Sequence, residues 1–175
     1  MTTITAKRLS SGKVQVAWDA QATSGGQATK NVVKVRKING QFAVGGSGTL
    51  RFLNVIHRAS VDQIHPADIA SPGFDAEGWL IDVLVPCWAR ALQQAAEYDP
   101  DGDQPEGLAL VVLAGRIFEV GIDFSVLDMG EFAAIGSGGP FASTAMHLGK
   151  SATQAVHIAS EIDLYTGGDV KEMKL

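Results

Sequence analysis

Two threonines follow the first methionine in the opening sequence MTTIT, and one of them could be a nucleophile. A threonine hydroxyl is a weak nucleophile until a base accepts its proton. A threonine at the amino end of a chain carries such a base, because a free α-amine has an ordinary pKa of about 7.7–8.0. Removal of Met1 would convert Thr2 into a residue of this kind. Read locally, the same segment is an ordinary β-prone start.

The other reactive side chains match no familiar catalytic or metal motif. Ser137 lies in the sequence IGSGG, where a glycine directly precedes the serine, so it does not match the G-x-S-x-G nucleophile elbow. We interpret the histidines as ordinary surface or core residues, because no metal-site spacing relates them: His57, His65, His147 and His157. Thr2 therefore decides whether the chain can be an enzyme.

The first half of the sequence carries strand patterns that would position Thr2. Alternating apolar and polar residues predict strands at residues 2–7, 13–19, 32–38 and 41–44. Asn39-Gly40 is a strong hairpin signal between the last two of them. The glycine-rich run 45–48 closes this half and leads into a predicted helix over residues 49–59.

The middle of the chain carries one long helical pattern with a proline inside it. Apolar residues recur at helical spacing from Ala76 to Tyr98, and Pro86 lies within that stretch. A proline in a helix interior removes a hydrogen bond and clashes with the preceding turn. The helix is therefore expected either to kink or to restart with Pro86 at its first position.

The second half again places strands before helices. Short strands are predicted at residues 108–114, 117–120, 124–127 and 132–135. Pro140 is well placed to begin a helix, and Ser151 with Gln154 forms a capping-box pattern for a second helix, with a tail strand after Leu164. Segregated runs of strands and helices predict an α+β fold in a single domain over residues 1–175. Helices outside two packed antiparallel sheets would explain apolar strands such as LALVVLA.

The composition is that of a well-packed globular protein. The chain has 175 residues, of which 46% are hydrophobic and 19% are charged. A net charge of −5 without a Lys/Arg cluster argues against a nucleic-acid partner. No apolar run approaches the ~20 residues of a membrane span. The single cysteine, Cys87, and the lack of a signal-peptide pattern predict a cytoplasmic protein.

Four separate blocks of the sequence resemble HslV-type peptidases, the bacterial relatives of proteasome β-subunits. They occur in the family's order and read TTITAKRLSSGKVQVAWDAQAT, KNVVKVRKI, AIGSGGPFA and SEIDLYTG. The resemblance covers residues 2–50 and 132–167, while residues 58–130 match only in the succession of elements. It implies the four-layer αββα sandwich of the N-terminal nucleophile hydrolases.

The resemblance also implies a set of catalytic residues. Thr2 corresponds to the family's nucleophile, which is exposed when the preceding residue is removed. Lys34 corresponds to a lysine whose positive charge disfavours protonation of the α-amine and keeps it available as a base. Asp19 would hold Lys34 charged and oriented, and Ser137 corresponds to a serine that hydrogen-bonds near the amine. Ser47 occupies the oxyanion-hole position.

Further positions are implied for substrate and for a cation. Thr23 would pair with the substrate backbone in β-fashion, and Gly45 and Gly46 would leave an open, apolar pocket for a substrate side chain. No cofactor is expected for the chemistry itself. The family often binds a monovalent cation such as Na⁺ through backbone carbonyls, at positions that correspond here to Ser160, Asp163 and Thr166. Asp163 departs from the uncharged residue that is usual there.

These implications predict a threonine-type endopeptidase. Thr2 would attack a peptide carbonyl, and water would release the resulting ester. The subunits would assemble with copies of themselves in stacked rings, act on peptides or unfolded proteins, and need an ATP-driven unfoldase ring for folded substrates. Two alternatives stay open. One is a catalytically inactive, proteasome-like scaffold or assembly subunit that retains Met1, and the other is an amidase that acts on a small molecule.

Overall fold

Strand β1 (Thr3–Arg8) continues directly from Thr2 and lies inside a four-stranded antiparallel sheet. The computed structural model describes residues 2–24, 27–40, 42–61, 63, 66–98, 101 and 103–175. The sheet has the order β10-β1-β2-β11, with β2 at Val14–Asp19, β10 at Phe132–Gly136 and β11 at Val170–Lys174. Met1, and with it the predicted processing of the chain, lies outside the described residues.

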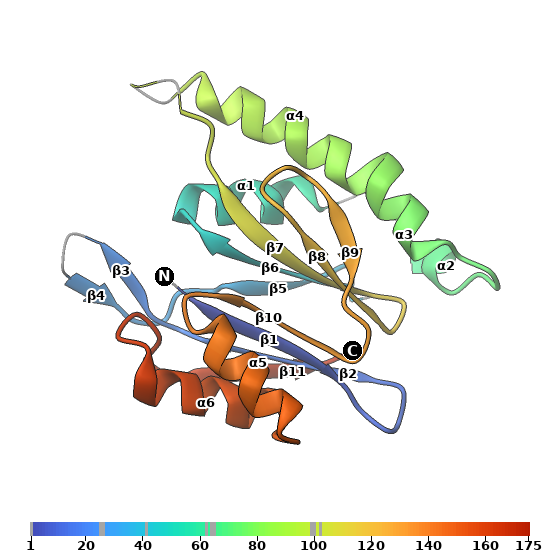
Figure 1. Ribbon diagram of the computed structural model, residues 1–175. Helices are drawn as coiled ribbons and strands as arrows, with labels where there is room; N and C mark the ends of the chain where they lie inside the picture. The colour runs from blue at the N-terminus through green and yellow to red at the C-terminus, as the bar shows by residue number, and fades with distance from the viewer. Residues whose placement is uncertain are drawn as a thin grey trace.

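A second antiparallel sheet packs against the first and has the order β5-β6-β7-β8-β9. Its strands are β5 (Val35–Ile38), β6 (Phe42–Gly48), β7 (Gly107–Leu113), β8 (Arg116–Val120) and β9 (Val126–Asp128). A short hairpin of β3 (Ala22–Ser24) and β4 (Gln27–Thr29) projects beside the amino end of the chain (Figure 1).

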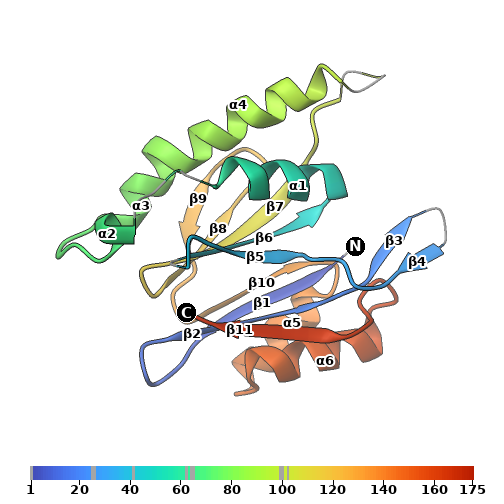
Figure 2. The same ribbon diagram turned by 180° about the vertical axis from the view of Figure 1, so that it is seen from behind.

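Helices cover the outer face of each sheet and complete four layers (Figures 1 and 2). Over the second sheet lie α1 (Leu50–Ala59), α2 (Pro66–Ile69), α3 (Ala76–Trp79) and α4 (Val85–Ala96). Over the first sheet lie α5 (Gly139–His147) and α6 (Ala152–Ile162). The predicted α+β, αββα sandwich is therefore confirmed.

Three apolar cores separate these layers. The core between the two sheets includes Ile4, Trp18 and Leu110. A second core fills the space under α1 and α4, and a third, rich in alanine, lies under α5 and α6. Strands such as β7 are thus buried on both faces, because each sheet packs against the other sheet and also against helices.

Several local predictions hold because their causes are local. Asn39 and Gly40 have positive φ angles of 47° and 73° in the connection between β5 and β6, whose pairing closes at Ile38 and Phe42, so the predicted hairpin forms here. The capping box of Ser151 and Gln154 is formed at the start of α6. A π-helical stretch, Leu80–Leu84, joins α3 to α4, and the α-helix restarts with Pro86 in its first turn.

Several boundaries differ from the predictions. The glycine-rich run 45–48 is the end of β6 instead of a closing loop, and Ala22–Ser24 pairs with Gln27–Thr29 as β3 and β4. Strand β9 starts at Val126, since Phe124 has a φ of 65° in the turn before it. The tail strand starts at Val170 instead of Leu164. Within the described part of the chain, no helix is long and apolar enough to cross a membrane.

Candidate active site

A pocket of about 570 Å³ opens where β1 begins. It is bounded by Thr2, the β3–β4 hairpin, Lys34, the end of β6 and the start of α1. Thr2 is nearly buried, with 5% of its surface exposed. Thr2 therefore has both a defined position and a space beside it for a ligand.

Asp19 fixes the segments that meet around this pocket. It is fully buried at the end of β2, and its Oδ1 accepts hydrogen bonds from the Thr3 amide and from Lys34 Nζ, each at 2.8 Å. Its Oδ2 accepts from the amides of Gln21 at 3.2 Å and Gly167 at 3.1 Å. Four donors therefore compensate one buried carboxylate, which ties β1, the β2–β3 connection, Lys34 and the segment before β11 together.

Lys34 is a buried cation next to Thr2. Only 1% of its side chain is exposed, and it forms the 2.8 Å ion pair with Asp19. Burial lowers the pKa of the Lys34 amine from its ordinary value, while the negative charges and hydrogen bond of Asp19, and the charge of Asp163, act in the opposite direction. A cation held in this way supplies a fixed positive field in the pocket.

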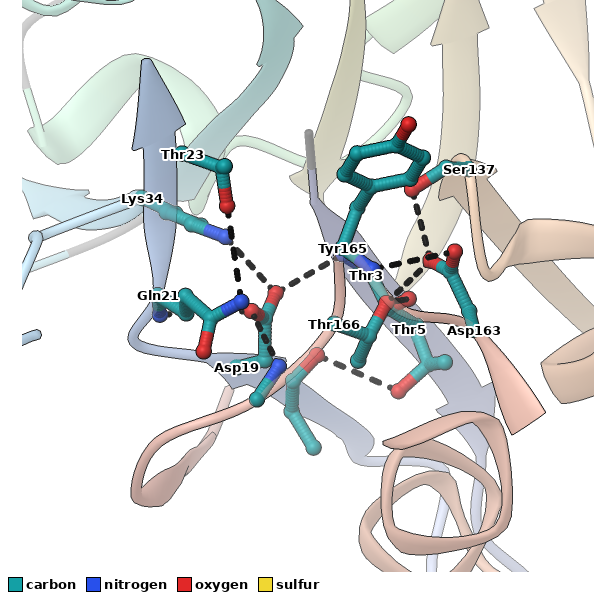
Figure 3. Close-up of polar contacts among 12 residues, drawn as sticks. Thr3, Thr5, Asp19, Gln21, Thr23, Lys34, Ser137, Asp163, Tyr165 and Thr166 are labelled. Atoms are coloured by element: carbon teal, nitrogen blue, oxygen red, sulfur yellow. Dashed lines mark hydrogen bonds and ion pairs between the residues drawn. The ribbon is translucent and has the colours of Figure 1, made fainter. Parts of the chain in front are cut away.

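A second polar cluster lies on the other side of Thr3 (Figure 3). The carboxylate Oδ2 of Asp163 accepts hydrogen bonds from the hydroxyls of Ser137 and Thr166, each at 2.6 Å. The Thr166 oxygen also lies 2.6 Å from the Thr3 hydroxyl oxygen. Burial would raise the pKa of the Asp163 carboxyl, but hydrogen bonds from Ser137, Thr166 and the Tyr165 amide hold it below its ordinary value.

The glycine before Ser137 brings this second cluster close to Thr2. Gly136 pairs with Thr3 across β1 and β10 and has a φ of 94°. A Cβ atom at this position would lie 1.9 Å from the Thr2 carbonyl oxygen, so only glycine fits. Ser137 is thereby placed directly beside the amino end of the chain.

Comparison with known proteins supports the fold. No protein-family model and no curated protein matches the chain. Among solved structures, BPH of Thiobacillus denitrificans in complex with epoxomicin matches with a TM-score of 0.76 and 22% identity, and covers 99% of this chain and 97% of that one. BPH without that compound gives 0.74 at 22% identity, with the same coverage. Eukaryotic HslV from Trypanosoma brucei gives 0.68 at 23% identity over 99% and 98% of the two chains.

The chain has the HslV-type fold. This outcome confirms the resemblance on which the sequence-based expectations for the fold rest. One fold can carry many activities, so the function of this chain has to follow from its own site residues.

Within the HslV-type fold, most of the predicted site residues gather around β1. Thr2, Thr23 and Lys34 line the pocket. Asp19 is not among the lining residues and forms the ion pair with Lys34. Ser137 lies on the opposite side, bonded to Asp163 instead of lining the pocket. The catalytic roles of these residues stay predictions, but their proximity is a property of the structure.

The glycine and serine positions on β6 divide between the two faces of the sheet. Gly46 and Gly48 line the pocket, and Ser47 between them is 8% exposed. Gly45 is not among the residues that line the pocket, and its predicted role in shaping a substrate subsite stays a prediction. A Cβ at position 45 would lie 3.0 Å from Val35 and 3.1 Å from Ile4, in the core between the sheets, because strand residues alternate in direction. Gly46 lines the pocket, although a Cβ there would lie 3.1 Å from Ile56 and Leu53, on the side of α1.

The three positions predicted for a cation are engaged with the protein itself. The Ser160 hydroxyl donates to the His157 carbonyl, and the Asp163 carbonyl accepts from the Thr166 amide at 3.1 Å. The side chains of Asp163 and Thr166 are directed into the polar cluster with Ser137. Among the described residues, no three His, Cys, Asp or Glu side chains gather as a metal site, and cation binding by backbone carbonyls stays a prediction.

Three contributions to the site were not predicted from the sequence. Thr3 appeared as an ordinary strand residue, yet its amide and hydroxyl bond to both clusters. The amides of Gln21 and Gly167 complete the shell of Asp19, although no local pattern marks them. Asp163 and Thr166 were expected only as cation ligands, and the unusual charge at position 163 was the one available signal of a different role.

Proposed function

We propose that the chain is a threonine endopeptidase subunit whose nucleophile is Thr2 once the α-amine of that residue is free. One observation carries the proposal. Thr2 and Lys34 line the same pocket of about 570 Å³, and a buried carboxylate, Asp19, holds Lys34 in place at 2.8 Å. This combination provides a hydroxyl, its own amine base, a cation to tune that base, and room for a substrate.

The charge on Lys34 would keep the base ready. A nearby positive charge disfavours protonation of an amine, so the α-amine of Thr2 would be neutral over more of the neutral pH range. Asp19 prevents the lysine from moving toward solvent, since its carboxylate binds Lys34 and three backbone amides at once. On the other side, the Ser137 hydroxyl donates to Asp163, which leaves its oxygen free to accept a hydrogen bond from the amine.

In the proposed reaction, the proton of the Thr2 hydroxyl moves to the α-amine while Oγ1 forms a bond to the substrate carbonyl carbon. A backbone amide at the end of β6, after Gly46, would stabilise the resulting oxyanion, since the Gly46 amide itself donates to the Lys34 carbonyl. The peptide C–N bond then breaks, and the ammonium returns its proton to the leaving amine. Water attacks the ester that remains and gives a proton to the amine. That proton returns to Oγ1 as the acid product leaves.

The pocket favours an extended peptide with an uncharged side chain at the cleavage point. Strand β5 pairs with β6 as far as Val35 and Gly45, and the Gly46 amide still donates to the Lys34 carbonyl at 3.2 Å, so only Ser47 and Gly48 lie beyond this pairing, beside the pocket. Thr23 on β3 lines the facing wall, and a peptide between the two could pair with both edges. The apolar lining residues are Ala22, Leu50 and Leu53, and the charge of Lys34 is already paired.

Assembly follows from the proposed activity by analogy with the HslV-type fold. Copies of the chain would form stacked rings that enclose the pockets, and unfolded polypeptide would be delivered by an ATP-driven unfoldase. Light scattering of the purified protein measures the first of these expectations directly.

Labelling of Thr2 tests the proposed chemistry. The experiment measures intact mass, hydrolysis of fluorogenic peptides, and reaction with a peptide vinyl sulfone, with epoxomicin as competitor because the similar BPH is seen in complex with it. A protein without Met1 is expected to hydrolyse peptides and to gain one label. Thr2→Ala should lose both activities, while Thr144→Ala, an exposed change on α5, should keep them. A folded, Met1-free protein with neither activity would contradict the peptidase proposal, whereas an inactive protein that retains Met1 would fit the scaffold alternative.

A further inference from the structure

The residue after the proposed nucleophile is held at two points. The Thr3 amide donates to Asp19 Oδ1 at 2.8 Å, and the Thr3 hydroxyl oxygen lies 2.6 Å from that of Thr166 (Figure 3). Thr3 is completely buried and does not line the pocket. Its backbone thus belongs to the Asp19 cluster, and its side chain belongs to the Asp163 cluster.

Chemistry fixes the direction of the contact between the two hydroxyls. The Thr166 hydroxyl donates to the Asp163 carboxylate at 2.6 Å, and a carboxylate can only accept. The single proton of Thr166 is therefore already committed, so Thr3 must donate to Thr166. The resulting chain runs from Thr3 to Thr166 to Asp163, where Ser137 donates from the other side at 2.6 Å. Hydrogen bonds that end on a charged acceptor are stronger than neutral ones.

The loop that carries Ser137 closes tightly over this contact. A Cβ atom at Gly138 would lie 2.0 Å from the Thr3 hydroxyl oxygen and 2.7 Å from that of Thr166. The φ of Gly138 is −82°, which any residue can adopt, so the requirement for glycine is one of space alone. The hydroxyl pair and the Ser137 loop therefore fit against one another with no room for a further atom.

We infer that Thr3 is a positioning residue for the reaction proposed above, on which this inference rests. Its hydroxyl sets how far the amino end of β1 lies from the Ser137 loop, while its amide sets the distance to the Asp19–Lys34 pair. The amine of Thr2 has to meet both sides at once. A misplacement of about 1 Å at such a point can cost on the order of 100-fold in rate.

A matched pair of threonines on β1 provides the test. Thr3 and Thr5 lie on the same face of the strand and are both fully buried. The Thr5 hydroxyl donates to the carbonyls of Ala17 at 3.2 Å and Ala152 at 3.1 Å, outside both clusters. Valine replaces threonine with nearly the same shape, so Thr3→Val and Thr5→Val each remove one buried hydroxyl and differ in which partner loses it.

The experiment measures kcat and KM for a fluorogenic peptide, with thermal unfolding as a check on folding. Thr3→Val is expected to lower kcat by about 10- to 100-fold with KM changed by less than about twofold, because Thr3 does not contact the substrate. Thr3→Ser, which keeps the hydroxyl, should recover most of kcat. Thr5→Val should keep kcat within about twofold of the unaltered protein.

Two results would overturn the inference in an active protein. One is a kcat for Thr3→Val that equals that of Thr5→Val. The other is a failure of Thr3→Ser to exceed Thr3→Val, which would mean that Thr3 contributes only packing. If Thr3→Val does not fold, Gly138→Ala can replace it, because the added methyl group would displace the Thr3 hydroxyl from the side of the Ser137 loop. An unchanged kcat in Gly138→Ala would also overturn the inference. Inactivity of the unaltered, Met1-free protein would instead contradict the proposed function.

Discussion

Two buried aspartates flank the start of β1, and they are compensated in different ways. Asp19 is fully buried and accepts from one cation and three backbone amides. Asp163 is 9% exposed and accepts from two hydroxyls and one amide. The hydroxyls that donate to Asp163 can rotate their protons toward other acceptors. The buried ion pair of Asp19 has no such freedom, because water does not reach it to replace either charge.

This difference indicates that the two clusters have different roles. The Asp19 cluster holds a permanent charge in a fixed place, and its partners are mostly backbone atoms that the fold itself positions. The Asp163 cluster is built from side chains, and its hydroxyls connect the Ser137 loop to the first strand. Removing Asp19 should therefore damage folding and chemistry together, whereas changes around Asp163 should act more on chemistry.

The largest effect is expected from Asp19→Asn. This change leaves the buried Lys34 without its negative partner, and loss of one member of a buried ion pair costs about 3–5 kcal/mol. Chemical denaturation should show a free energy of unfolding lower by this amount, with loss of peptide hydrolysis. Asp169→Asn is the control, because Asp169 forms an exposed pair with Lys171 and should change stability by less than about 1 kcal/mol. Equal effects of the two changes would mean that the Asp19 cluster has no special structural role.

Asp163→Asn should have a smaller effect on stability. The amide keeps one oxygen acceptor but cannot accept both hydroxyls as a carboxylate does, so about 1–3 kcal/mol is expected. The fall in kcat should be out of proportion to this loss, because Ser137 and Thr166 lose their common partner. The fall in kcat relative to the loss of unfolding free energy, measured for Asp163→Asn and Asp19→Asn in parallel, shows whether the two clusters differ in role. Similar ratios would mean that the Asp19 and Asp163 clusters do not differ in role.

The contrast between the clusters also separates what the sequence can predict from what it cannot. The Asn39-Gly40 hairpin, the capping box of Ser151 and the restart at Pro86 depend on a few neighbouring residues, and all three appear in the structure. The β3–β4 hairpin has strands of three residues, which are too short to carry an alternation. Predictions failed where a boundary depends on tertiary contacts.

For the site, residues marked by the resemblance were brought together, but their connections were not predictable. Gly45 and Gly46 are adjacent glycines, and nothing in the residue type shows that Gly46 lines the pocket and Gly45 does not. The donors to Asp19 include the Gly167 amide, 148 residues away in sequence, and a backbone amide has no signature in the residue type. Thr3 was missed for a related reason, since a threonine on a buried strand is common.

A third buried group, His57, allows acid effects to be assigned to the right part of the molecule. It lies on α1, 3% exposed, with its Nε2 3.0 Å from the Val44 carbonyl oxygen. Burial lowers its pKa to about 4. Because this value is below that of the unfolded chain, about 6.5, the neutral form stabilises the fold above pH 6.5, and this stability is lost as the pH falls toward 4.

Between pH 7 and pH 5 the loss from His57 should be about 2 kcal/mol, measured as the change in the free energy of unfolding. His57→Gln should be less stable at pH 7 but lose correspondingly less on acidification. His157→Gln, an exposed change on α6, should follow the unaltered protein at both values. Asp163 has a lowered pKa, so its contribution is lost only at still lower pH. If His57→Gln loses as much unfolding free energy on acidification as the unaltered protein does, another group is responsible for the acid sensitivity.

The smallest effect, and the most specific for the Asp19 cluster, is a shift in the pH dependence of the reaction. Lys34→Met breaks the same buried ion pair and should cost stability as Asp19→Asn does. In the fraction that folds, loss of the cation beside the proposed amine base should raise the pKa of that base by about one unit. The rate falls when the base is protonated, and the acid limb of kcat/KM should therefore move to higher pH by the same amount. Lys37→Met, an exposed change on β5, should leave the limb in place. Asp163→Asn keeps Lys34, so a shift confined to Lys34→Met assigns the tuning of the base to the first cluster. A shift of equal size in Asp163→Asn would mean that both carboxylates set the charge at Thr2, and the two clusters would then be one electrostatic unit.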